Sequence, residues 1–308
     1  MPSKKAFQCT HLPDGPAVLT ERMPTARTVS LGIWIPAGSR QEDPAQEGMA
    51  HFWEHMAFKG TTSRTARDIA LEFDLLGGLA DAYTSREQTC FTIRAAADHL
   101  PRAFDILADI VLRPRLDPAE IGREKDVILQ EIGMIEDTPD DRLLESLWEA
   151  AWGDRALAHP ITGAAGSVSA FEASGLWTWR AAAYRPTTMV VAAAGAVDHQ
   201  ALADMTARAF SDLPSAGPVS LRQAVAPSFR PGTLALERDV EQTHVAMGFP
   251  LPGNADPGRF ARAALSTILG GNMSSRLFQE VREKRGLAYA VSSDVNALAD
   301  VGLLEIHA

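Results

Sequence analysis

The chain has 308 residues, of which 46% are hydrophobic and 22% are charged, and its formal net charge is −10. This composition is typical of a globular protein with room for two domains, and the negative charge disfavours a nucleic-acid partner and mildly favours basic peptides. No apolar run approaches the roughly 20 residues that cross a bilayer. The first residues show neither a secretory signal nor a transit peptide, so we expect a cytoplasmic protein with no membrane span.

Alternating and amphipathic segments, bounded by Pro and Gly, predict both strands and helices along the chain. The first two strands flank the turn Pro13-Asp14-Gly15, and a polar loop at residues 38–47 leads into the first helix. The expected strands cover residues 5–9, 16–22, 28–36, 79–85, 88–95 and 187–194, and the expected helices cover 49–58, 63–76, 99–112, 117–137, 140–152, 169–184 and 198–211.

The segment Gly48–Gly60, GMAHFWEHMAFKG, places an H-x-x-E-H set in an apolar helix. His51, Glu54 and His55 fall on one face at about 100° per residue, and the other positions up to Phe58 are apolar, so the helix is expected to be buried. Buried polar groups without partners cost about 1–3 kcal/mol each, and a divalent metal would satisfy them.

The alternative is that these are two ordinary core histidines beside a surface glutamate. We favour the metal site because only 8 of 308 residues are His, so this spacing arises by chance in about one of a hundred such chains. The H-x-x-E-H pattern is typical of inverzincin peptidases.

The helix that starts at Asp117-Pro118-Ala119-Glu120 carries two acids in an apolar stripe. Glu124 and Glu131 are seven residues apart and therefore lie on nearly the same face. Carboxylates in such a stripe are costly unless a charge meets them. They are either the solvated edge of an amphipathic helix or, as we favour beside an incomplete metal site, part of that site.

The pattern of the first half starts again after a segment rich in Pro, Ser and Ala at residues 213–230, which we interpret as an interdomain linker. We therefore expect a domain at residues 1–212 and a second, related domain at 231–308. Thr267 and Gly271 stand where the first copy has its two histidines, so the second copy lacks metal ligands. It also stops within its expected hairpin, which indicates either a fragment or a sheet face that a partner covers. At an offset of 216, the matching residues are Glu237-Arg238, Val245, Gly248 and Pro252 with Glu21-Arg22, Val29, Gly32 and Pro36, and at an offset of 208 the segment 286–290 resembles 78–82.

Four segments together resemble the pitrilysin (insulinase-type) zinc metallopeptidases, most closely the β subunit of mitochondrial processing peptidase and its bacterial homologues. These segments are HFWEHMAFKGT, AYTSREQT, VILQE and MSSRLFQEVREKRGLAYAVSS. The resemblance implies an α+β fold of tandem related domains, each a mostly antiparallel sheet covered by helices, with the second copy incomplete here. In this family the two halves clamp an unfolded peptide.

The resemblance implies one zinc ion per chain, held by His51, His55 and Glu131, with 75 residues between the last two. It assigns the general base to Glu54 and a supporting acid to Glu124. Zinc is expected from ligand type and family, although Mn²⁺ or Co²⁺ also accepts such ligands in vitro.

The resemblance also implies substrate contacts in both halves. Arg282 and Tyr289 have the seven-residue spacing of a family pair that reaches the substrate, whereas by themselves they resemble a solvated helix charge and a strand aromatic. The AYTSREQT strand is the expected platform for an extended peptide. Asp81 departs there from the usual Asn, which predicts a preference for basic residues.

The expected function is therefore a zinc endopeptidase that cleaves unfolded or presequence-like basic peptides through a zinc-bound water and a Glu general base. A homodimer, or a heterodimer with a related subunit, is the expected assembly. The alternative is a noncatalytic or truncated family member that binds peptides or serves as an assembly subunit.

Overall fold

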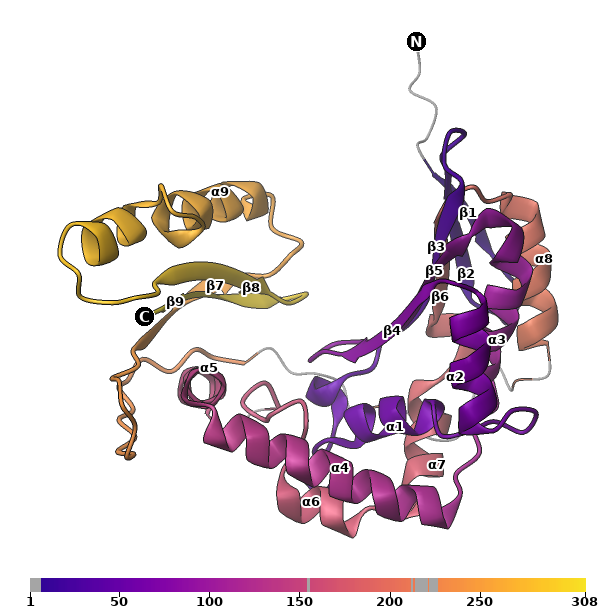
Figure 1. The fold of residues 1–308 in the computed structure, drawn as a ribbon, viewed down its shortest axis with the longest axis horizontal. Helices are drawn as coiled ribbons and strands as arrows, with labels where there is room; N and C mark the ends of the chain where they lie inside the picture. The colour runs from indigo at the N-terminus through magenta and orange to yellow at the C-terminus, as the bar shows by residue number, and fades with distance from the viewer. Residues whose placement is uncertain (1–6, 154–155, 212, 214–220, 222–226) are drawn as a thin grey trace. The chain divides into compact units, whose positions relative to one another are not determined.

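The computed structural model describes residues 7–153, 156–211, 213, 221 and 227–308 (Figure 1). It forms two compact units, the first from residues 1–130 and 160–223 and the second from residues 131–159 and 224–308. Among the described residues, no helix is long and apolar enough to cross a membrane.

A six-stranded sheet forms the centre of the first unit. Its strand order is β1-β2-β6-β3-β5-β4, with β2 and β6 parallel and the other neighbours antiparallel, so β4 is an edge strand. The predicted strands are confirmed within a few residues, except that residues 5 and 6 lie outside the described part. The strands are β1 (Gln8–His11), β2 (Ala17–Arg22), β3 (Thr28–Ile35), β4 (Leu79–Thr84), β5 (Thr89–Ala96) and β6 (Val190–Gly195).

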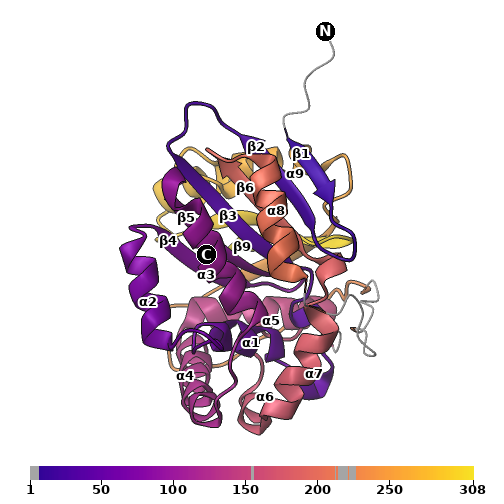
Figure 2. The same cartoon turned by 90° about the vertical axis from the view of Figure 1, so that its right-hand side faces the viewer.

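Two helices cover one face of this sheet (Figure 2). α3 (Leu100–Leu112) packs on β3 and β5, and α8 (His199–Phe210) packs on β2 and α3. In β3, Val29, Leu31, Ile33 and Ile35 are buried, whereas Thr28 and Ser30 on the other face are exposed and Trp34 is half-buried. This alternation is what a strand with one covered face requires.

Helix α1 (Met49–Ala57) packs against β4, β5 and α7 (Ala173–Ala183). Eight of its nine residues are buried, which confirms the buried helix expected from its apolar composition. The ring of Trp53 on α1 packs against two aromatic rings, with its centroid 5.7 Å from that of Trp177 and 5.6 Å from that of Tyr184. Such edge-on aromatic pairs add to the stability that burial provides.

Helices α2 (Ala66–Leu75) and α4 (Pro118–Asp137) follow the expected pattern, and the Asp117 carboxylate caps α4 by accepting from the amide of Ala119 at 2.9 Å. The single helix expected at residues 169–184 is wrong: there are two helices, α6 (Ala165–Ala170) and α7. Phe171 and Glu172 between them are extended, and the ring of Phe171 packs on Phe52 of α1 at 5.5 Å. That tertiary contact interrupts the helical pattern.

The second unit contains a three-stranded antiparallel sheet in the order β7-β9-β8. Residues 131–159 belong to this unit, whereas the sequence placed them in the first domain. The reason is a buried cluster in which Trp148 and Trp152 pack with Leu303, and the Trp148 indole donates to Glu305 at 2.8 Å. Most of the predicted linker lies outside the described residues, and the domain limits at 212 and 231 stay a prediction. The elements here are α5 (Pro139–Trp152), β7 (Ala246–Pro252), α9 (Arg259–Gly270), a π-helical turn (Phe278–Glu283), β8 (Ser292–Ala297) and β9 (Val301–His307).

The internal repeat is visible in the strand order, because β7-β9-β8 repeats the order and antiparallel pairing of β3-β5-β4. The two copies differ in how the matching residues are covered. Val29, Leu31 and Ile33 are at most 2% exposed, whereas the residues 216 positions later are about half exposed. These later residues are Val245, Met247 and Phe249, with exposed fractions of 47%, 50% and 47%.

Candidate metal centre

Helix α1 presents His51, Glu54 and His55 on one face, as the spacing predicts. The ring centroids of the two histidines are 4.5 Å apart. Burial lowers the pKa of His51 to about 4, with a further lowering by His55 and an opposing effect of Glu124. His51 is therefore neutral near pH 7, and a neutral imidazole has the lone pair that a metal ion needs.

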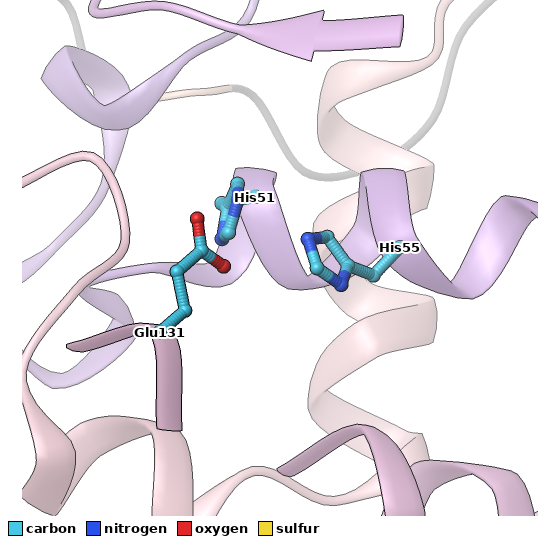
Figure 3. Close-up of side chains that lie close together, drawn as sticks. All are labelled: His51, His55 and Glu131. Atoms are coloured by element: carbon cyan, nitrogen blue, oxygen red, sulfur yellow. The ribbon is translucent and has the colours of Figure 1, made fainter. Parts of the chain in front are cut away.

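Glu131 joins this pair from α4. One possible ligand atom from each of His51, His55 and Glu131 lies within 4.8 Å of the others, and among the described residues this is the group that could hold a metal ion. In Figure 3 the Glu131 carboxylate points toward His51, and His55 lies one turn further along α1. The helix α4 is continuous from Pro118 to Asp137, so Glu131 lies two turns beyond Glu124.

Glu124 is buried and connects a histidine to a lysine. His55 Nδ1 lies 2.7 Å from Oε1, and Lys59 Nζ lies 2.6 Å from Oε2. Burial alone raises the pKa of this carboxyl, but the hydrogen bonds from His55 and Lys59 outweigh it and hold the pKa below its usual value. Since a carboxylate only accepts, His55 donates from Nδ1, which leaves the Nε2 lone pair for a metal.

Glu54, between the two histidines, is held by the end of an edge strand. The Thr84 hydroxyl, at the end of β4, donates to Glu54 Oε2 at 2.6 Å. Burial raises the pKa of the nearby Tyr184 well above its usual value, and the charge of Glu54 raises it further. Tyr184, the residue that follows α7, therefore keeps its proton.

Sequence reasoning missed Lys59, Thr84 and Tyr184. Lys59 lies two residues beyond the end of α1, so helical spacing gives no signal for its contact with Glu124. No local signal exists for Thr84 or Tyr184 either, since both reach Glu54 only through the tertiary fold.

The three expected substrate residues lie in two places, Asp81 on β4 and the pair Arg282 and Tyr289 in the second unit. Asp81 is exposed on β4, and its carboxylate accepts from the amide of Ala82 at 3.0 Å. Arg282 and Tyr289 lie together in the second unit, with the guanidinium carbon 4.8 Å from the tyrosine ring centre. Tyr289 is 81% exposed, so its ring is accessible within that unit.

Comparison with known families and proteins gives a consistent result. Residues 17–165 match the family model described as "Insulinase (Peptidase family M16)", and residues 171–308 match "Peptidase M16 inactive domain". A protein of Mycobacterium tuberculosis named an uncharacterised zinc protease is 41% identical over 302 residues, covering 97% of this chain and 69% of that protein. The uncharacterised zinc protease YmxG of Bacillus subtilis is 36% identical over 303 residues, covering 98% and 73%.

Solved structures show the same fold at lower identity. A protease from Helicobacter pylori superposes with a TM-score of 0.91 at 21% identity, covering 98% of this chain and 74% of that one. A peptidase M16 inactive domain from Pseudomonas fluorescens gives 0.90 at 24% identity, covering 98% and 73%. These likenesses confirm the expected α+β architecture.

The role of Glu124 can be tested by replacing its carboxylate with an amide. We expect Glu124→Gln to weaken zinc binding by about 10- to 100-fold, because the neutral amide no longer holds the His55 N–H and the Lys59 ammonium together. Competition against a chromophoric chelator measures the affinity. Asp126→Asn, an exposed acid two residues along α4, is the matched control. Equal zinc affinities for Glu124→Gln and Asp126→Asn would contradict this role of Glu124.

Proposed function

The chain belongs to the insulinase (M16) family of peptidases, and from that premise we propose that it is a zinc-dependent endopeptidase that cleaves unfolded peptides. The observation that carries the proposal is the close approach of His51, His55 and Glu131, with Glu54 on the same helix. The names of the relatives support zinc binding and proteolysis, whereas the substrate and the mechanism are our own proposal.

The residues fit a single zinc ion. Two imidazoles and one carboxylate are a donor set that catalytic zinc sites use, and it leaves the fourth position open. His51 is held neutral by burial, and Glu124 orients His55. When bound, zinc supplies a Lewis acid that lowers the pKa of a water molecule to about 7 and polarises a peptide carbonyl.

Glu54 is the proposed general base. Its carboxylate takes the proton from the attacking water as the new C–O bond forms, and returns a proton to the amine as the C–N bond breaks. The hydrogen bond from Thr84 fixes the rotamer of Glu54, so the base is held in place before the substrate binds.

The edge strand β4 is the proposed platform for the substrate, because of the described strands it pairs with β5 alone. An extended peptide can add to such an edge through main-chain hydrogen bonds, which selects unfolded segments. The exposed carboxylate of Asp81 favours a basic side chain in the substrate. Arg282 and Tyr289 are proposed as substrate contacts contributed by the second half.

A second candidate function is a noncatalytic peptide-binding or assembly subunit. The half-exposed Val245, Met247 and Phe249 favour it, because an apolar sheet face of this kind is normally covered. We propose that the enzyme pairs with a second copy or a related subunit. If the chain cleaves nothing, the assembly role is the one that remains.

Replacing the proposed base tests the function. We expect Glu54→Gln to keep wild-type zinc content and to lower the turnover of a quenched, basic, unstructured peptide by about 10²- to 10⁴-fold. His51→Ala is expected to lose both zinc and turnover, because it removes a ligand. Zinc is measured by elemental analysis, and turnover by fluorescence.

Glu21→Gln, an exposed glutamate on β2, is the control and is expected to match the wild type. A Glu54→Gln protein that cleaves at the wild-type rate would contradict the assignment of the base. A wild-type chain that holds zinc and cleaves nothing would favour the noncatalytic subunit.

A further inference from the structure

The N-terminus of α1 is capped from outside the helix. The first amides of a helix have no partner within it and need one elsewhere. Gly48, the N-cap residue, has no side chain that could accept a hydrogen bond. The carboxylate of Glu42 accepts instead, with Oε2 2.8 Å from the amide of Gly48 and Oε1 2.7 Å from the amide of Ala50.

The position of Gly48 excludes an ordinary cap. Its φ is +91°, and a Cβ atom at this position would lie 2.6 Å from the carbonyl oxygen of Thr162. A Ser, Thr or Asp therefore cannot stand at the N-cap without strain. The capping oxygen has to come from another part of the chain, and Glu42 supplies it while completely buried.

The segment that carries Glu42 is itself attached to the turn of the β4–β5 hairpin. The amide of Ser39 donates to the carbonyl of Ser85 at 3.2 Å, and the amide of Arg40 donates to that of Arg86 at 2.8 Å. The buried guanidinium of Arg40 pairs with Glu87 at 2.6 Å. Residues 38–42 therefore form a short segment that connects the hairpin turn to the first turn of α1, and Glu42 is its last residue.

Each end of this segment contacts an element that carries residues of the candidate centre. The hairpin turn directly follows Thr84, whose hydroxyl holds Glu54. Helix α1 carries Glu54 and also His55, whose ring nitrogen meets Glu124. A shift of α1 along its axis by a fraction of a turn would therefore break both hydrogen bonds at once.

We infer that Glu42 is a positioning residue that fixes α1 against the β4–β5 hairpin and so holds its histidines and Glu54 in place for metal binding and catalysis. Carboxyl oxygens that accept hydrogen bonds at the N-terminus of this nine-residue helix also interact favourably with the helix dipole. The catalytic part of this inference rests on the proposed function. The positioning role of Glu42 is tested separately, through zinc affinity and the order of α1.

The test compares Glu42→Gln with Asp43→Asn in the 308-residue chain. Both replace one carboxyl group by an amide at adjacent positions, but Asp43 is exposed and Glu42 is buried. In Glu42→Gln one acceptor becomes an amide N–H that faces the backbone N–H groups of α1. We expect a loss of zinc affinity of about tenfold or more, as for other groups that orient metal ligands. Hydrogen exchange at Gly48 and Ala50 should become faster, and kcat should fall while KM for the basic peptide stays unchanged.

A loss of general stability would give a different pattern. Leu202→Ala on α8 leaves a cavity away from α1 and should lower the midpoint of thermal unfolding with unchanged zinc affinity. If Glu42→Gln does not fold, Glu42→Asp, which keeps the carboxyl group and shortens its reach, makes the same comparison. The inference is overturned if the Glu42 variant binds zinc and exchanges these amides as Asp43→Asn does. Zinc binding by a wild type that cleaves nothing would overturn the proposed function and leave the test of Glu42 valid.

Discussion

The burial of polar side chains on α1 is the constraint on which the rest of the candidate centre depends. Two imidazoles and a carboxylate in an otherwise apolar helix lose their hydration on folding, and each needs a partner to offset that loss. The structure provides protein partners for part of this need, with Glu124 at His55 and Thr84 at Glu54. Glu131 lies close to the two imidazoles, and a cation between them would be a partner for both imidazoles and for the Glu131 carboxylate.

The partners of His55 and Glu54 come from other elements of the fold, namely Glu124 of α4 and Thr84 of β4. Lys59 and His55 share the Glu124 carboxylate and hold its pKa low, so the acid stays charged although it is buried. Glu42 anchors the start of α1. Such arrangements fix side chains before a ligand arrives, which lowers the reorganisation that binding and catalysis would otherwise require.

Local sequence signals predicted the parts of the site that lie within one element. The H-x-x-E-H spacing placed three side chains on one helical face, and the seven-residue spacing placed Glu124 and Glu131 on nearly the same face of a second helix. The partners that reach the site from elsewhere were not predictable in this way. Thr84 and Glu42 are ordinary polar residues in the sequence, and their roles arise only when the hairpin and the loop fold against α1. The break at Phe171 has the same cause, because the packing of its ring on Phe52 of α1 overrides a local helical pattern.

Anomalous diffraction at the zinc absorption edge, from crystals of the zinc-loaded chain, tests the metal assignment most directly. We expect one strong peak, with bonds of about 2.0–2.2 Å to a ring nitrogen of His51, a ring nitrogen of His55 and a carboxylate oxygen of Glu131. A peak at other residues, or no peak between α1 and Glu131 in crystals that contain zinc, would contradict the assignment and the mechanism built on it.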